Sequence, residues 1–78
     1  MKRVADEARQ MLVKKYRSEF RRYYLEEKEK LSFPSYNTDP VAYYRLHGKV
    51  TTKARLRLIG AHHNEFILLK WEIRSNAH

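Results

Sequence analysis

Hydrophobic residues recur every three or four positions through the first part of the chain. This spacing places them on one side of a helix, and no glycine or proline interrupts the segment. The pattern therefore predicts one long helix over about residues 3–31, roughly 40 Å in length. Its predicted apolar side consists of Val4, Ala8, Met11, Leu12, Tyr16, Phe20, Tyr23, Tyr24 and Leu31.

A loop and a short helix are predicted to follow the long helix. Residues 32–39 are rich in serine, proline, asparagine and threonine, a composition typical of loops. Pro40 suits the first position of a helix, and Thr38 or Asp39 can cap it. Because glycine often follows the last turn of a helix, we expect Gly48 to end a short helix over residues 40–47.

From Lys49 onward the hydrophobic residues alternate with polar ones. Two alternating runs, over about residues 49–59 and 65–74, flank a short polar turn, which is the pattern of an antiparallel β-hairpin. We therefore predict an α+β fold, with a long N-terminal helix, a short second helix and a C-terminal β-hairpin. A helix is the alternative for residues 52–73, since Leu56, Ile59, His63, Phe66 and Ile67 also fit a helical stripe.

The predicted elements belong to one small domain over residues 1–78, with no internal repeat that we identify. One helix on two strands leaves a sheet edge open, which favours completion of the fold by a homodimer. The chain has no cysteine and no apolar run of about 18 residues, and Met1 is followed by charged residues. These features favour a cytoplasmic protein.

Charge points to the class of partner. Lys and Arg number 17 against nine Asp and Glu, which gives a net charge of +8. Such an excess is typical of proteins that bind a polyanion or an acidic protein surface. Two rows of cations lie opposite the predicted apolar faces, one on the long helix and one on the first strand, and two further cations extend them. The predicted nucleic-acid-binding residues are Lys14, Arg17, Arg21, Lys28, Lys49, Lys53, Arg55, Arg57, Lys70 and Arg74.

We interpret these rows as a surface that binds the phosphate backbone of DNA or RNA with little sequence specificity. A charged and solvated face without a partner is the simpler alternative. Most aromatic residues lie on the apolar faces and are expected to pack in the core. Tyr36 and one of Tyr43 or Tyr44 are better candidates for exposed contacts with a base.

Two other functions fit the same composition. The first is an accessory or inhibitor protein that docks its cationic surface on an acidic face of a larger protein. The second is a metal-independent ribonuclease using residues such as Tyr43, Arg45, His47 and His63. We predict no catalytic residue, cofactor or metal site, since His62 and His63 have no further ligands nearby in the sequence.

The tripeptide Lys15-Tyr16-Arg17 is similar, apart from one position, to the short signature of a group of small mitochondrial accessory proteins. That resemblance implies a bundle of long helices, which the predicted elements do not continue past residue 31. We assign no family from it.

Overall fold

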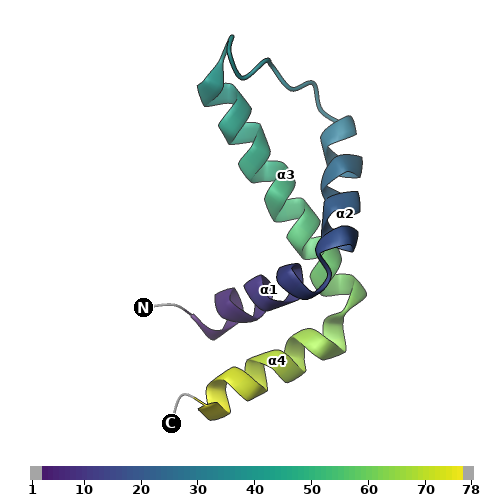
Figure 1. Ribbon diagram of the computed structural model, residues 1–78, viewed down its shortest axis with the longest axis vertical. Coiled ribbons are helices and arrows are strands. Elements are labelled where there is room, and N and C mark those ends of the chain that lie inside the picture. Colours follow the sequence, from purple (N-terminus) through teal and green to yellow (C-terminus); the bar gives the residue numbers. More distant parts are fainter. Residues whose placement is uncertain (1–2, 77–78) are drawn as a thin grey trace.

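The computed structural model describes residues 3–76, which form four helices and no strand (Figure 1). The helices are α1 (Val4–Lys15), α2 (Arg17–Glu29), α3 (Pro40–Ala61) and α4 (His63–Asn76). The predicted α+β fold is therefore wrong, since both predicted strands lie within helices α3 and α4. Residues 1–2 and 77–78 of the predicted domain lie outside the described range.

Burial in α3 explains why the hairpin prediction failed. Val50, Ala54 and Leu58 are 0%, 0% and 1% exposed, and they recur every four residues, as on one side of a helix. Leu56 and Trp71, placed on the apolar face of the predicted hairpin, are 63% and 61% exposed. The alternating run thus contained a helical stripe. Residues 52–73 are helical, as the alternative predicted, except at the break at His62. The stripe proposed for that alternative is wrong, since Leu56 and His63 are exposed.

The start of α3 agrees with its sequence signals, but its predicted end does not. Pro40 occupies the first turn, and the Asp39 carboxylate accepts a hydrogen bond of 3.1 Å from the backbone N–H of Ala42. Gly48 lies in the middle of α3, with no glycine in the described chain at positive φ. A glycine in a helix lowers stability without ending the helix, so the stop predicted there was wrong.

Two single non-helical residues separate successive helices. Tyr16 (φ −113°, ψ 47°) separates α1 from α2, and His62 (φ −125°, ψ 44°) separates α3 from α4. The predicted helix over residues 3–31 is therefore two helices. The chain folds as two bent helical segments side by side, with α1 against α4 and α2 against α3 (Figure 1). The rings of Tyr16 and His62 stack on one another, so the two breaks lie at the same level.

The molecule is elongated and thin, with extents of 48 × 26 × 14 Å. Its radius of gyration is 14.8 Å, whereas a compact chain of this length would have about 11.5 Å. The buried apolar side chains are few: Ala8, Leu12, Val50, Ala54, Leu58 and Phe66.

Two expectations about partners and location depend on this fold. Because the described residues contain no strand, the open sheet edge from which we predicted a homodimer does not exist. Within the same range, no helix has both the length and the apolar character needed to cross a bilayer.

Candidate anion-binding groove

A groove between α2 and α3 gathers predicted site residues from both cationic rows. On α2, Arg17, Arg21 and Tyr24 follow one another at intervals of four and three residues, which places them on one side of the helix. On α3, which runs antiparallel to α2, Arg55 lies on the same side as Thr51. The residues that line the groove are Val13, Arg17, Phe20, Arg21, Tyr24, His47, Thr51 and Arg55.

The cationic end of the groove carries uncompensated charge. Arg17, Arg21 and Arg55 are exposed, and none forms an ion pair with another described residue. No residue lining the groove is acidic. Asp6 lies in a neighbouring hollow that also includes Arg55, but its carboxylate is bonded to Arg9. One guanidinium group can donate two parallel hydrogen bonds to the oxygens of a phosphate or carboxylate. The three arginines therefore make this end of the groove suitable for binding an anion.

The other end of the groove is aromatic. The Tyr24 hydroxyl and His47 Nδ1 lie 2.7 Å apart, and burial raises the pKa of the Tyr24 hydroxyl above its usual range. His47 in turn stacks on Tyr43, with ring centroids 6.5 Å apart. Beyond it lies the aromatic tip, the cluster formed by Phe33, Tyr36, Tyr43 and Tyr44.

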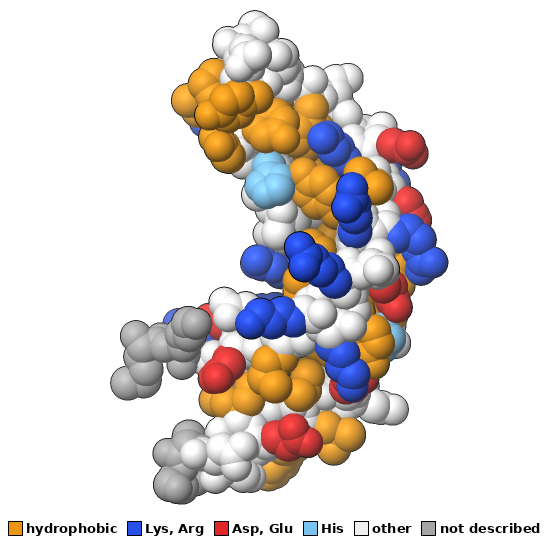
Figure 2. Space-filling model, in the orientation of Figure 1, with side chains coloured by type: hydrophobic (Ala, Val, Ile, Leu, Met, Phe, Trp, Pro, Cys, Tyr) orange, Lys and Arg blue, Asp and Glu red, His pale blue; other side chains and the backbone are white. Residues whose placement is uncertain are grey.

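The rings of the aromatic tip contact one another edge to face, with centroids 5.6–5.8 Å apart. A hydrogen bond with Tyr36 raises the pKa of the Tyr44 hydroxyl. Figure 2 shows hydrophobic side chains gathered at this tip and Lys and Arg side chains gathered along α2 below it. Tyr36 and Tyr44 are 51% and 59% exposed, which confirms the expectation that tyrosines here are open to contact.

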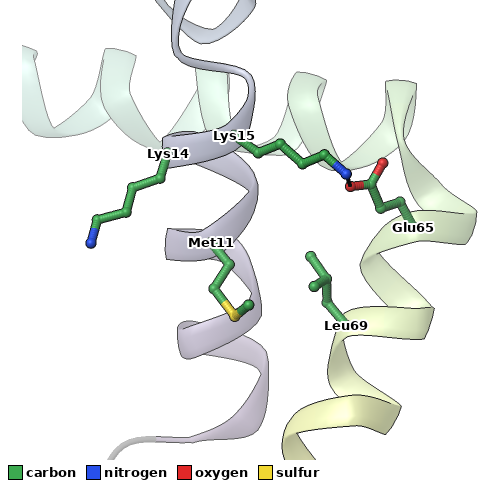
Figure 3. Close-up of a pocket in the computed structure, with 5 residues that line it drawn as sticks. All are labelled: Met11, Lys14, Lys15, Glu65 and Leu69. Carbon is green, nitrogen blue, oxygen red and sulfur yellow. Dashed lines mark hydrogen bonds and ion pairs between the residues drawn. The ribbon is translucent and has the colours of Figure 1, made fainter.

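The two other cations of the predicted helical row, Lys28 and Lys14, do not line the groove. Lys28 continues the row on α2, with its Nζ 5.1 Å from the centre of the Phe33 ring and 5.9 Å from that of Tyr43. Lys14 lies on α1, before the break at Tyr16. It contributes to the lining of a separate hollow with Met11 and Leu69, and its side chain points away from α4 (Figure 3). The break thus removes Lys14 from the row that the uninterrupted helix predicted.

The row predicted on the first strand is dispersed around α3. Lys49 and Lys53 line a different hollow, with Gly48 and Thr52. Arg57 binds Glu26 and Glu27, with N–O distances of 3.2 Å, and its guanidinium lies 4.4 Å from the centre of the Tyr23 ring. Arg57 therefore holds α3 against α2. Residues 49–57 are helical, so the predicted row of cations on one face of a strand does not exist.

The cations predicted near the C-terminus lie on α4. Lys70 Nζ is 4.9 Å from the centre of the Phe66 ring, and the Arg74 guanidinium is 6.0 Å from that of Trp71. Neither residue lines the groove. Trp71, which was expected to pack in the core, is exposed.

Sequence reasoning missed Tyr24 and His47 as groove residues. Tyr24 was assigned to the apolar side of the long helix, although its position seven residues after Arg17 also places it beside the cationic row. A helix stop at Gly48 predicts His47 at the end of a short helix, whereas α3 continues to Ala61. Recognising α3 as continuous would have placed His47 and Thr51 on one side of it, one turn apart.

The break residues carry a network of charged hydrogen bonds. Lys15 Nζ lies 2.6 Å from Glu65 Oε2, and the Tyr16 hydroxyl donates to the same carboxylate (Figure 3 shows the Lys15 pair). These two bonds, with Lys15 the stronger influence, lower the pKa of Glu65. They also raise the pKa of Lys15 and that of the Tyr16 hydroxyl.

The second carboxylate of this network is Glu19. Its Oε2 atom accepts a hydrogen bond of 2.8 Å from the Tyr23 hydroxyl and lies 2.9 Å from His62 Nε2. The bond from Tyr23, followed by that from His62, lowers the pKa of the Glu19 carboxyl. Across the described residues, three or more potential metal ligands nowhere gather into a site.

Comparison of the chain with family models, with curated proteins and with solved structures found no match. The tripeptide Lys15-Tyr16-Arg17 assigns no family.

Proposed function

We propose that this protein binds nucleic acid through the phosphate backbone, with little sequence preference, in the groove between α2 and α3. One observation carries the proposal: Arg17, Arg21 and Arg55 converge from two helices on a groove that no carboxylate lines. Like charges placed close together lower stability unless a ligand neutralises them. A phosphate backbone supplies that negative charge at regular intervals.

Weak sequence preference follows from the shape of the groove. Helices α2 and α3 lie side by side in a single layer, so neither projects as a recognition helix into a major groove. Apart from its arginines, the lining offers Thr51 and His47 as polar groups for base edges, and His47 is already bonded to Tyr24. Contacts to phosphate position a protein without reading the sequence.

The test is a binding titration, followed by fluorescence anisotropy, with labelled oligonucleotides of unrelated sequence. If the three arginines contact phosphates, affinity should fall about 20- to 40-fold between about 50 and 200 mM salt. The double variant Arg17→Ala/Arg21→Ala should weaken binding to every sequence alike.

Lys49→Ala/Lys53→Ala is the matched control, because it removes the same charge from the other side of α3. Equal losses from the two double variants would show a general charge effect and contradict the groove. Absence of any complex at about 50 mM salt and micromolar protein would refute nucleic-acid binding itself.

Docking on a larger protein is the second candidate, and a different observation favours it. On α4, Leu68 and Trp71 are each 61% exposed and lie three residues apart, so they present adjacent apolar surface on one side of the helix. Exposed apolar clusters are typical of surfaces that another protein covers. If this function holds, a tagged chain will retain a protein partner after nuclease treatment. Leu68→Glu will then release the partner, whereas Lys49→Ala/Lys53→Ala will not.

A further inference from the structure

The aromatic tip and the arginine groove form one continuous track. On α3, Tyr44, Thr51 and Arg55 share a side of the helix, since they are spaced by seven and four residues. Tyr44 precedes Arg55 by eleven residues, which corresponds to about 17 Å along the helix. His47 lies between them and contacts both Tyr24 and Tyr43. A linear ligand held by the arginines therefore reaches the tip by following α3.

The tip presents exposed rings that contact an inner ring. Tyr36 and Tyr44 are exposed, whereas Tyr43 is partly buried between them, Phe33 and His47. Edge-to-face contacts with this inner ring fix the outer tyrosines without a hydrophobic core beneath them. Exposed rings held in place are the surfaces on which unpaired bases stack.

Positive charge also continues to the tip. Lys28 lies above the Phe33 and Tyr43 rings, at the end of the row formed by Arg17 and Arg21 on α2. Cations therefore accompany the track over its whole length, with rings at one end. Proteins that hold single-stranded nucleic acid combine such a cationic groove with stacking side chains.

Resting on the proposed function, we propose that the ligand is single-stranded nucleic acid. Its backbone lies along Arg17, Arg21 and Arg55, and its bases stack on Tyr36 and Tyr44. A duplex hides the faces of its bases within the stack, so it gains the phosphate contacts alone. An acidic peptide would likewise use the arginines and gain no stacking of bases. Single strands are therefore the class for which both ends of the track contribute.

The experiment compares three labelled probes of about 12 nucleotides: oligothymidylate, an abasic strand of the same phosphate number, and a duplex. The abasic strand keeps the charge and removes every base. The protein should bind oligothymidylate at least about five-fold more tightly than the abasic strand for each stacked base. Tyr36→Ala and Tyr44→Ala should each lower the affinity for oligothymidylate by a similar factor and leave the affinity for the abasic strand unchanged. Tyr44→Phe should retain most of the affinity, because it keeps the ring.

Trp71→Ala is the matched control, since it removes an equally exposed ring on α4, away from the track. Circular dichroism confirms that each variant is folded. The inference is overturned if the abasic strand or the duplex binds as tightly as oligothymidylate, or if a polyglutamate peptide displaces it with equal potency. It is also overturned if the Trp71 and tyrosine variants lose affinity alike. Failure of all three probes to bind would instead refute the proposed function.

Discussion

The ring of Tyr16 stacks on the ring of His62, with their centroids 3.8 Å apart and their planes inclined by 13°. These are the two residues at which the helical segments break. Each is bonded to a glutamate in the first turn after the other break, Tyr16 to Glu65 and His62 to Glu19. The two bends are therefore held by reciprocal contacts.

The reciprocity follows from a repeat in the sequence. Each break is preceded, four residues earlier, by a buried leucine and followed by glutamate and phenylalanine at the third and fourth positions. The first copy is Leu12, Tyr16, Glu19 and Phe20, and the second is Leu58, His62, Glu65 and Phe66. We found no repeat in the sequence alone, because the two copies lie in segments that were assigned to a helix and a hairpin.

Stability should depend on the stacked pair. Tyr16→Ala removes both the ring from the stack and the hydrogen bond to Glu65, so the melting midpoint measured by circular dichroism should fall by several degrees. Tyr16→Phe keeps the ring and loses the hydrogen bond alone, so its effect should be smaller. Equal midpoints for the wild type and Tyr16→Ala would show that the stack does not stabilise the bend.

Acid should destabilise the fold through its paired carboxylates. The pKa values of Glu19 and Glu65 are lowered by bonds to Tyr23 and Lys15 respectively, and that of Glu27 is lowered by Lys30. A carboxyl with a depressed pKa contributes stability above its unfolded value, here 4.5, and loses it as the pH falls through the folded value. The contribution of these three carboxylates to the free energy of unfolding should therefore be constant from neutral pH down to about pH 5 and should decline below about pH 5. Urea unfolding at a series of pH values measures this.

A double variant separates these carboxylates from general acid effects. Glu19→Gln/Glu65→Gln should be less stable than the wild type at pH 7, because neutral amides lose the charged bonds. Its decline below about pH 5 should be shallower, since two of the titrating groups are gone. A decline as steep as that of the wild type would exclude Glu19 and Glu65 as its source.

The sequence allowed prediction of the starts of α1 and α3 and of the cationic row on α2, but not of the break at Tyr16 or of the fold beyond residue 48. The start of α3 depends on residues next to it in the sequence, since Asp39 caps the helix and Pro40 occupies its first turn, so the sequence alone predicts it. In contrast, the apolar residues between Val50 and Leu58 fit both the two-residue period of a strand and the four-residue spacing of a helix. The helix forms because it packs against α2 and α1, a contact that the local sequence does not reveal. The groove likewise required α2 and α3 to be antiparallel neighbours, because Arg55 meets Arg17 and Arg21 across that contact.

Gly48 offers a direct check on the continuity of α3. A Cβ atom at this position would meet no atom within 4 Å, and the backbone there is helical. Gly48→Ala should therefore raise the free energy of unfolding by about 0.5–1 kcal/mol, through higher helix propensity. If Gly48 instead ended a short helix in the left-handed conformation, alanine would lower it.

Arg57 should act on stability rather than on binding. Its guanidinium holds Glu26 and the buried Glu27 and packs on Tyr23. Arg57→Ala leaves a buried carboxylate with a weaker set of partners, so the midpoint of unfolding should fall. Oligonucleotide affinity, measured at a temperature where the variant is folded, should remain close to that of the wild type. A loss of affinity matching that of Arg17→Ala/Arg21→Ala would place Arg57 in the binding site.

Substitutions of Leu56 and Leu58 distinguish the helical fold from the predicted hairpin, because the two folds bury these residues differently. The alternating pattern placed both on one apolar face, whereas α3 buries Leu58 and exposes Leu56. Leu58→Ala should lower the free energy of unfolding by about 2–5 kcal/mol, because it removes a core side chain and leaves a cavity. Leu56→Ala should change it by less than about 0.5 kcal/mol, as is usual for surface positions. Chemical denaturation of the two variants measures both, and comparable losses would contradict the single continuous helix over Pro40–Ala61.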